Sequence, residues 1–360
     1  MKRLFITDCE GPISKNDNAL ETLSHFVPQG DRLFTVVSRY DDVLSDVLRR
    51  PGYEAGDTLK LVLPFLKAYD VTDEEIRQFS ARNLVLIAHA GDSLRHVRSI
   101  APAYIVSTSY EHYIRALCKA LEFPFEKTYC TKLSLDVYAI TSEEKDCLKK
   151  AGREIVQLPV FESPAEAKSL KDLPEETRTT IRRLDEIFWK TIAKMPIGKI
   201  YSEVNPVGGR EKAEAIKDIA GKDGVALTDT MYVGDSITDE EAFKLVKENG
   251  GLAVSFNGNQ YAVRNAEIAL LSADSLTTAL IADVFVRFGK TETLKLVAKW
   301  NRRTLENSLV NVDLRERFLK LHPRELPKAK IITRENMKDL AKESSEFRKK
   351  VRGEAIGRLG

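Results

Sequence analysis

Short apolar runs alternate along the chain with segments of helical pattern. The runs that predict buried strands lie at residues 2–7, 104–107, 127–131, 231–234, 252–256 and 268–271. Most of the segments between them carry apolar residues at helical spacing. Alternation of short buried strands with helices is typical of a parallel sheet covered by helices. The pattern therefore predicts an α/β fold with a Rossmann-like parallel sheet.

Two long helical stretches interrupt this alternation, at residues 15–100 and 136–199. The first contains a capping box at Thr72–Glu75, and Pro64 is expected to kink or end a helix there. The second contains a capping box at Thr141–Glu144. The second stretch also holds Ser163-Pro164-Ala165-Glu166, which has the pattern of a helix start, and a long helix is expected after Pro174. Both stretches are expected to be mostly helical insertions into the core.

The pattern after residue 286 is again helical, with apolar stripes that we interpret as packing surfaces. A chain of this length is expected to fold as two domains or as one domain with insertions. The division that the pattern predicts is a core at 1–14, a helical insertion at 15–100, core at 101–135, a second helical insertion at 136–199, core at 200–286, and a basic helical C-terminal extension at 287–360.

Composition narrows the class of protein. Of the 360 residues, 43% are hydrophobic and 31% are charged, which supports a buried core and excludes a disordered chain. No apolar run reaches the roughly 18 residues of a membrane-spanning helix, and the first apolar stretch is too short for a signal peptide. The four cysteines show no paired spacing and suit reduced thiols, so a cytoplasmic protein without a membrane partner is expected.

Charge is distributed unevenly between the body and the C-terminal extension. Residues 287–360 hold 20 basic and 10 acidic residues, whereas residues 1–286 hold 36 basic and 44 acidic residues. The simplest interpretation is a solvated helical surface. The alternatives are that the extension binds a protein partner or a nucleic acid. Aromatic residues are sparse there and no nucleic-acid motif is present, which argues against nucleic-acid binding.

Acidic residues follow two of the predicted strands. Asp8 and Glu10 come directly after the first strand, and Asp235 and Asp239 follow the strand at 231–234. Parallel strands present their carboxyl ends, where ligands bind, at one edge of the sheet. An acidic turn and a capped helix start are the simpler interpretations, but neither explains four carboxylates gathered at one edge. Such a group needs a cation, and Mg²⁺ prefers oxygen ligands.

Two weaker features complete the candidate site. Ser107-Thr108-Ser109 ends the second predicted strand, where hydroxyl and backbone N–H groups can hold phosphate oxygens. The Gly208-Gly209 turn places Lys212 at the start of a helix, where it can contact an anion. Taken alone, the hydroxyl residues suit an ordinary helix cap, and the lysine suits a solvent-exposed surface.

In this order the motifs resemble those of the haloacid dehalogenase-like (HAD) hydrolase superfamily. Asp8 with Glu10 matches its first motif, Ser107 its second, Lys212 its third, and the Asp235/Asp239 pair its fourth. The resemblance covers residues 1–14, 101–135 and 200–286. Glu10 departs from the commoner second aspartate. The chain most resembles the archaeal phosphoserine phosphatase-like group, which includes proteins named energy-converting hydrogenase A subunit R; Thr131–Asp136 and Ser255–Asn257 contribute to that similarity.

The resemblance implies a mechanism. Asp8 would be the nucleophile and form an aspartyl-phosphate, and Glu10 would be the acid and base. Mg²⁺ would lie on the Asp8 carboxylate, the Glu10 backbone carbonyl and Asp235, with Asp239 helping through water or by orienting Lys212. The phosphate-binding residues that the resemblance implies are Ser107, Thr108, Lys212 and Asn257.

The resemblance also implies that residues 15–100 form a cap over the substrate. Its polar candidates are Arg39, Asp41, Arg49, Arg50 and Tyr53, and the loop 51–57 could be its tip or an ordinary surface loop. The insertion at 136–199 lies where a second type of cap occurs, or else is a helical accessory. The expected function is Mg²⁺-dependent hydrolysis of a small phosphorylated metabolite; the alternative is a non-catalytic or regulatory subunit of a larger, hydrogenase-associated complex.

Overall fold

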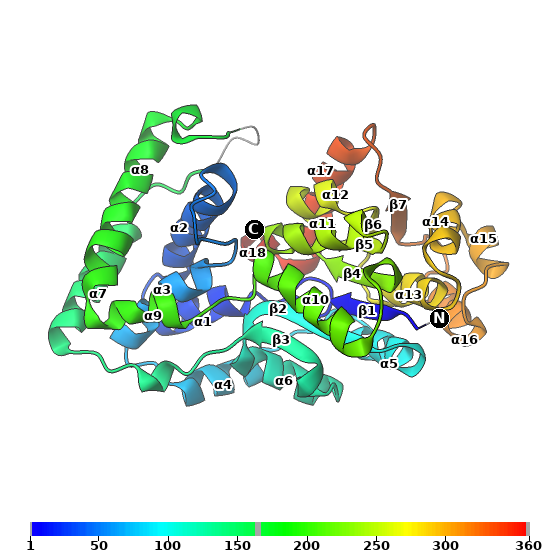
Figure 1. Ribbon diagram of the computed structural model, residues 1–360, viewed down its shortest axis with the longest axis horizontal. Coiled ribbons are helices and arrows are strands. Elements are labelled where there is room, and N and C mark those ends of the chain that lie inside the picture. Colours follow the sequence, from blue (N-terminus) through cyan, green and yellow to red (C-terminus); the bar gives the residue numbers. More distant parts are fainter. Residues whose placement is uncertain (1, 163–166, 358–360) are drawn as a thin grey trace.

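The computed structural model describes residues 2–162 and 167–357. Its centre is a seven-stranded sheet of order β3-β2-β1-β4-β5-β6-β7, parallel except for β7 (Figure 1). The strands are β1 (Leu4–Thr7), β2 (Ala103–Tyr110), β3 (Thr128–Thr131), β4 (Thr230–Gly234), β5 (Leu252–Phe256), β6 (Ile268–Leu271) and β7 (Lys328–Ile331). The first six lie where the sequence pattern predicts strands, so the predicted α/β fold with a parallel sheet is confirmed.

Alternation along the strands divides the sheet's apolar residues between two faces. Leu4 and Ile6 of β1 pack on one face, and Phe5 packs on the other. The first face is covered by α10 (Arg210–Asp223), α11 (Glu240–Glu248) and α12 (Gln260–Asn265). The opposite face is covered by α5 (Ala90–Ile100), α6 (Glu111–Leu121) and α13 (Leu276–Phe288). Helix α5, at the end of the segment predicted as a cap, thus packs on the sheet.

The two long insertions build one helical body beside the sheet (Figure 1). A single buried apolar cluster joins them, and the Tyr40 ring from the first stacks on the Phe188 ring from the second with centroids 5.7 Å apart. The helices are α1 (Asn18–Phe26), α2 (Gly30–Asp42), α3 (Thr58–Ala68), α4 (Asp73–Arg82), α7 (Ser142–Ile155), α8 (Glu175–Asp185) and α9 (Ile200–Glu203). The second insertion is therefore packed into the same body as the first.

Local helix signals agree with the structure at most positions. Both predicted capping boxes form, at Thr72 before α4 and at Thr141 before α7. Pro64 is expected to kink or end a helix, but α3 does not end there and continues to Ala68. The residues on both sides of Pro64 are buried, so packing offsets the backbone hydrogen bond that proline cannot donate. The predicted helix start at residues 163–166 lies outside the described residues.

The C-terminal extension is helical with one exception. Its helices are α14 (Lys290–Ala298), α15 (Arg302–Glu306), α16 (Val312–Leu321), α17 (Met337–Arg352) and α18 (Glu354–Gly357). The purely helical prediction is wrong at β7, which pairs with β6 in antiparallel register and buries Ala329. A four-residue edge strand rich in lysine is too short and too polar for the pattern to reveal. Across residues 2–162 and 167–357, no helix is long and apolar enough to cross a membrane.

Candidate active site

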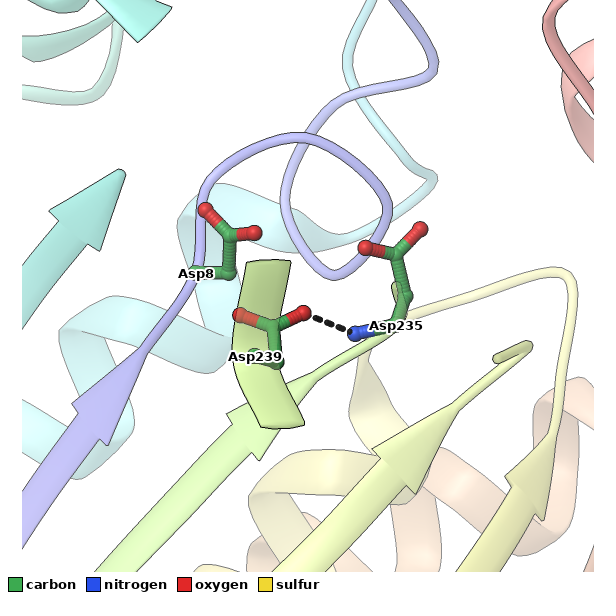
Figure 2. A group of neighbouring side chains, drawn as sticks. All are labelled: Asp8, Asp235 and Asp239. Atoms are coloured by element: carbon green, nitrogen blue, oxygen red, sulfur yellow. Dashed lines mark hydrogen bonds between the residues drawn. The ribbon is translucent and has the colours of Figure 1, made fainter. Parts of the chain in front are cut away.

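The carboxyl ends of β1 and β4 bring Asp8 together with the acidic pair Asp235 and Asp239. The two strands are hydrogen-bonded neighbours, and the Asp8 N–H donates to the Val233 carbonyl at 2.8 Å. One carboxylate oxygen from each of the three aspartates lies within 4.8 Å of the others, and all three side chains are buried. Figure 2 shows the three carboxylates around one space at the strand ends. The predicted gathering of acidic groups at this edge of the sheet is therefore present.

Lys212 lies at the centre of this group. Its ammonium donates to Asp8 Oδ2 at 2.7 Å and to Asp239 Oδ1 at 2.6 Å, and its side chain is completely buried. The glycine turn before α10 makes this possible, because the Gly209 N–H donates to the Thr238 carbonyl at 3.0 Å. That bond joins the turn to the acidic loop. The solvent-exposed alternative for this lysine is wrong.

Asp239 organises the loop that carries Asp235. Its Oδ2 accepts the N–H groups of Asp235 and Ser236 at 2.8 and 2.9 Å. Its Oδ1 accepts the Tyr232 hydroxyl at 2.6 Å as well as the Lys212 ammonium. Both carboxylate oxygens thus carry two donors each. This arrangement supports the role of orienting Lys212 better than that of a direct metal ligand.

Burial and neighbouring charges shift the pKa values of Asp8, Asp239 and Lys212 in different directions. Burial raises the pKa of Asp8 to about 7, although the Lys212 ammonium opposes the shift. Burial would also raise the pKa of Asp239, but the charge and hydrogen bond of Lys212 outweigh it, and the net pKa is lowered. Burial likewise tends to lower the pKa of Lys212, while the two carboxylates outweigh it and raise that pKa. The Lys212–Asp239 pair is therefore charged.

Glu10 lies on the same cavity as Asp8. Its Oε1 accepts the Asn18 N–H at 2.7 Å, and burial raises its pKa well above the ordinary value. Gly11, which directly follows Glu10, has φ +103°, and a Cβ there would lie 2.2 Å from Asp235 Oδ2. Glycine is therefore required at this position both by the backbone conformation and by the Asp235 carboxylate.

Ser107 and Thr108 belong to β2, which lies on the other side of β1. Ser107 is buried, and its hydroxyl donates to the Ser109 Oγ at 3.1 Å. The strand continues to Tyr110 rather than ending at Ser107 as the pattern predicts. The Thr108 hydroxyl donates to the Val207 carbonyl at 3.0 Å, which links β2 to the turn before Lys212. The residues of the four motifs thus come together at the carboxyl edge of the sheet. The further predicted phosphate-binding residue, Asn257, has a different role.

Asn257 is used within the scaffold. Its side-chain amide donates to the Ser272 carbonyl at 2.7 Å, and its side-chain oxygen accepts the Ser272 N–H at 2.9 Å. These two bonds join the end of β5 to the end of β6. Since both polar ends of the amide are engaged, the structure gives no support to the predicted contact with phosphate.

A cavity of about 100 Å³ connects the core motifs with the helical body. Gly56 lies close to the core, because a Cβ there would lie 2.9 Å from the Thr108 methyl group. Asp41 lines the cavity, and its Oδ2 accepts the Gly56 N–H at 2.9 Å. Arg49 and Tyr53 line a neighbouring cavity of about 810 Å³.

The other two polar candidates of the cap are engaged within the helical body. Arg39 pairs with Asp42, and Arg50 pairs with Asp185 at 2.6 Å. Neither contact reaches the acidic group at the strand ends. These two arginines therefore form ion pairs within the cap itself, whereas the loop predicted as a cap tip contributes Gly56 to the site.

Two residues of the site come from the C-terminal extension and were not expected there. Arg348 and Arg352 of α17 both bind Asp235 Oδ2, Arg352 at 2.9 Å. Both arginines are buried, with 3% and 9% of their surface exposed, which contradicts a fully solvated extension. Their i, i+4 spacing puts them on one face of the helix. This spacing is the one sequence signal that marks the two arginines as a pair. It does not identify Asp235, which is 113 residues away from Arg348, as their partner.

The donor set fits a divalent cation. Six carboxylates line the cavity, from Asp8, Glu10, Asp17, Asp41, Asp42 and Asp235, together with the two guanidinium groups of Arg348 and Arg352. Lys212 and Asp239 form a charged pair beside it. The carboxylates outnumber the cations, and a Mg²⁺ ion would offset part of the excess negative charge. Asp8 and Asp235 are the carboxylates best placed to hold it, because both line the cavity.

No family model matches the chain, and no curated protein matches it. Among solved structures, gene product AF1437 from Archaeoglobus fulgidus matches with a TM-score of 0.80 and 25% identity, over 100% of this chain and 99% of that chain. An apo phosphoserine phosphatase matches with a TM-score of 0.42 and 12% identity, over 81% of this chain and 100% of that chain. A phospho-aspartyl intermediate analogue of phosphoserine phosphatase matches with a TM-score of 0.40 and 13% identity, over 76% and 95%.

The architecture of the chain is a Rossmann-like core with a mainly parallel sheet, helical insertions and C-terminal helices. The match to the Archaeoglobus structure extends over the insertions and the extension as well as the core. None of the comparisons bears on the resemblance to hydrogenase-associated proteins, which stays a prediction.

Proposed function

We propose that the protein is a Mg²⁺-dependent phosphatase that hydrolyses a small phosphorylated metabolite through an aspartyl-phosphate. The observation that carries the proposal is the buried group of Asp8, Lys212 and Asp239 beside Asp235. A scaffold protein has no physical need for a fully buried lysine shared by two carboxylates. Buried charges destabilise a fold unless they are paired well, so such groups are retained mainly at functional sites.

The first chemical step belongs to Asp8. Its carboxylate attacks the phosphorus in line, the bond from phosphorus to the ester oxygen breaks, and the phosphoryl group is held on Asp8. Ser107, the Thr108 amide and Lys212 hold the phosphoryl oxygens and stabilise their charge. Asp8, Asp235 and the Glu10 carbonyl would hold Mg²⁺, which would supply further positive charge at these oxygens.

Glu10 handles the protons. In the first half-reaction its protonated carboxyl group gives a proton to the leaving alcohol, which departs neutral. In the second half-reaction the carboxylate takes a proton from water, which attacks the phosphorus and releases Asp8 and phosphate. Burial raises the pKa of Glu10, which supports the protonated starting state. The helical body above the site would exclude bulk water during both steps.

The nucleophile can be tested by replacing Asp8 with asparagine, which keeps the shape of the side chain and removes its charge. We expect Asp8→Asn to lose hydrolysis of phosphorylated metabolites, measured as phosphate release in a screen with Mg²⁺. Asp313→Asn, an exposed position on α16, is the matched control and should keep wild-type turnover. Wild-type turnover in Asp8→Asn would falsify the covalent mechanism.

The metal can be tested separately. We expect EDTA to abolish phosphate release and Mg²⁺ to restore it. Asp235→Ala should lower Mg²⁺ affinity while circular dichroism shows an intact fold. Unchanged Mg²⁺ affinity in a folded Asp235→Ala protein would show that the cation binds elsewhere.

A further inference from the structure

Helix α17 brings its last two turns into the candidate active site. It packs beside α12 and β6 through Leu340, which contacts an apolar cluster that includes Val263 and Leu271. The Ser344 hydroxyl donates to the Gly258 carbonyl at 2.7 Å, and this bond aims the following turns at the acidic loop. The fold therefore holds two arginine side chains at the strand ends by means of an element outside the four motifs.

The two arginines engage Asp235 in different ways. Arg348 donates from Nη1 to the Asp235 carbonyl at 3.1 Å and to Oδ2 of the same residue. Arg352 donates from Nη1 to Asp235 Oδ2, from Nε to the Lys15 carbonyl at 3.0 Å, and from Nη2 to the Asn16 carbonyl. Arg352 thus also ties α17 to the segment that follows the first motif.

These contacts supply charge at the same place as the expected cation. A guanidinium is permanently charged, so the pair brings two positive charges to the Asp235 carboxylate. With α17 docked, the two guanidinium groups offset two negative charges at the site; without them the site is more negative by two charges. The negative potential that attracts a divalent cation is therefore weaker while the helix is docked.

The docked helix also keeps the cavity small. Arg348 and Arg352 both line it, and its volume is about 100 Å³. Binding sites for small molecules usually measure about 300–1,000 Å³. The cavity beside the docked helix lies below this range.

Helix α17 is held by few apolar contacts. Within its described residues Leu340 is the one buried apolar side chain, and Met337, Ala341, Phe347 and Val351 are partly buried. The rest of its surface is mainly charged. Elements with few buried apolar contacts open at low cost, so a change in the balance of charge at Asp235 can move this helix.

We propose that α17 is an autoinhibitory gate: docked, Arg348 and Arg352 hold Asp235 and fill the site, and Mg²⁺ competes with them for this carboxylate. Binding of Mg²⁺ and release of the helix are then coupled, and each affects the other by the same factor. The proposal rests on the proposed function only in assigning the cation to Asp235. Its tests use Mg²⁺ alone. They can therefore fail in a protein that has phosphatase activity, and they can succeed in a protein that has none.

The first test compares Mg²⁺ binding by calorimetry in the full-length wild type and in the double variant Arg348→Gln/Arg352→Gln. We expect the variant to bind Mg²⁺ about 5- to 150-fold more tightly, the usual range of coupling between sites. Lys350→Gln removes one charge from the exposed face of the same helix and should leave the affinity within about twofold. Unchanged or weaker binding in a folded double variant would overturn the gate.

A second variant covers the case in which the double variant does not fold. Leu340→Ala weakens the docking of α17 without removing charge, so it should also tighten Mg²⁺ binding. In the wild type, Mg²⁺ should speed hydrogen exchange of the amides in Met337–Arg352. Slower exchange there with Mg²⁺ would mean that the arginines and the cation support each other, and would refute competition.

Discussion

Asp41 shows how a single buried group can affect the stability of the helical body. Its side chain is 4% exposed, and Asp42 and Asp57 lie near it. Burial, with the charges of these two neighbours, raises its pKa to about 8. In the unfolded chain an aspartate has a pKa near 3.9. Between these two values the folded protein binds one proton more than the unfolded chain, so stability falls as the pH rises.

Asp41→Asn removes this titration and keeps an oxygen that can accept the Gly56 N–H. We expect the variant to gain stability over the wild type as the pH rises from 5 to 8, by up to about 1.4 kcal/mol per pH unit. Urea unfolding of both proteins across this range measures the difference. A difference that does not change with pH would mean that Asp41 is ionised in the folded protein.

The residues that the sequence could predict share one property: each lies next to a recognisable strand or turn. Asp8 and Asp235 each follow an apolar run, and Lys212 follows a glycine pair. Arg348 lies in a charged helix with nothing nearby to distinguish it from Lys349 or Lys350. Its partner is 113 residues away, and only the folded chain brings them together. Sequence patterns report local geometry, so contacts of this kind escape them.

At the scale of elements, the loop at residues 51–57 precedes α3 within the helical body and contacts the core. Gly52 and Gly56 both have positive φ, at +73° and +99°. A Cβ at Gly52 would meet nothing within 4 Å, whereas one at Gly56 would lie 2.9 Å from the Thr108 methyl group and 3.3 Å from the Thr238 methyl group. The two glycines therefore share a backbone requirement and differ in their contact with the site.

That difference makes a matched pair of variants. Gly52→Ala and Gly56→Ala should each lose about 1 kcal/mol of stability, since alanine is strained at positive φ. Only Gly56→Ala should also push the loop away from Thr108, and we expect its kcat/KM to fall about tenfold or more. Steady-state phosphate release and thermal unfolding measure the two effects. Equal kcat/KM values in both variants would show that this loop does not shape the site.

Helices and strands could be predicted where a short stretch of sequence specifies them. The six parallel strands, the two capping boxes and the helix start of α10 follow from short patterns. Strand β7 and the continuation of α3 through Pro64 depend on neighbours that the local sequence does not contain. In both cases tertiary packing outweighs the local preference of the chain.

At the scale of the whole molecule, three separate segments converge on one edge of the sheet. The core provides the acidic group, the joined insertions provide the wall that carries Gly56, and the C-terminal extension provides the arginines. The sequence pattern predicted the acidic group, the family resemblance implied a cap over the site, and the extension was interpreted most simply as a solvated surface. An acidic body and a basic extension with opposite net charges are consistent with an extension that docks on the acidic site.

The central claim is that Asp8 carries the phosphoryl group, and trapping that group tests it most directly. Glu10→Gln lacks the base for the second step, so its release of phosphate should fall about 10²–10⁴-fold. p-Nitrophenyl phosphate needs no protonated leaving group, so the variant should still give a burst of p-nitrophenol. Acid quenching after the burst, followed by mass spectrometry, should show one phosphoryl group on the peptide that contains Asp8. A burst-free reaction with no phosphorylated peptide, or a phosphoryl group on another residue, would contradict the account.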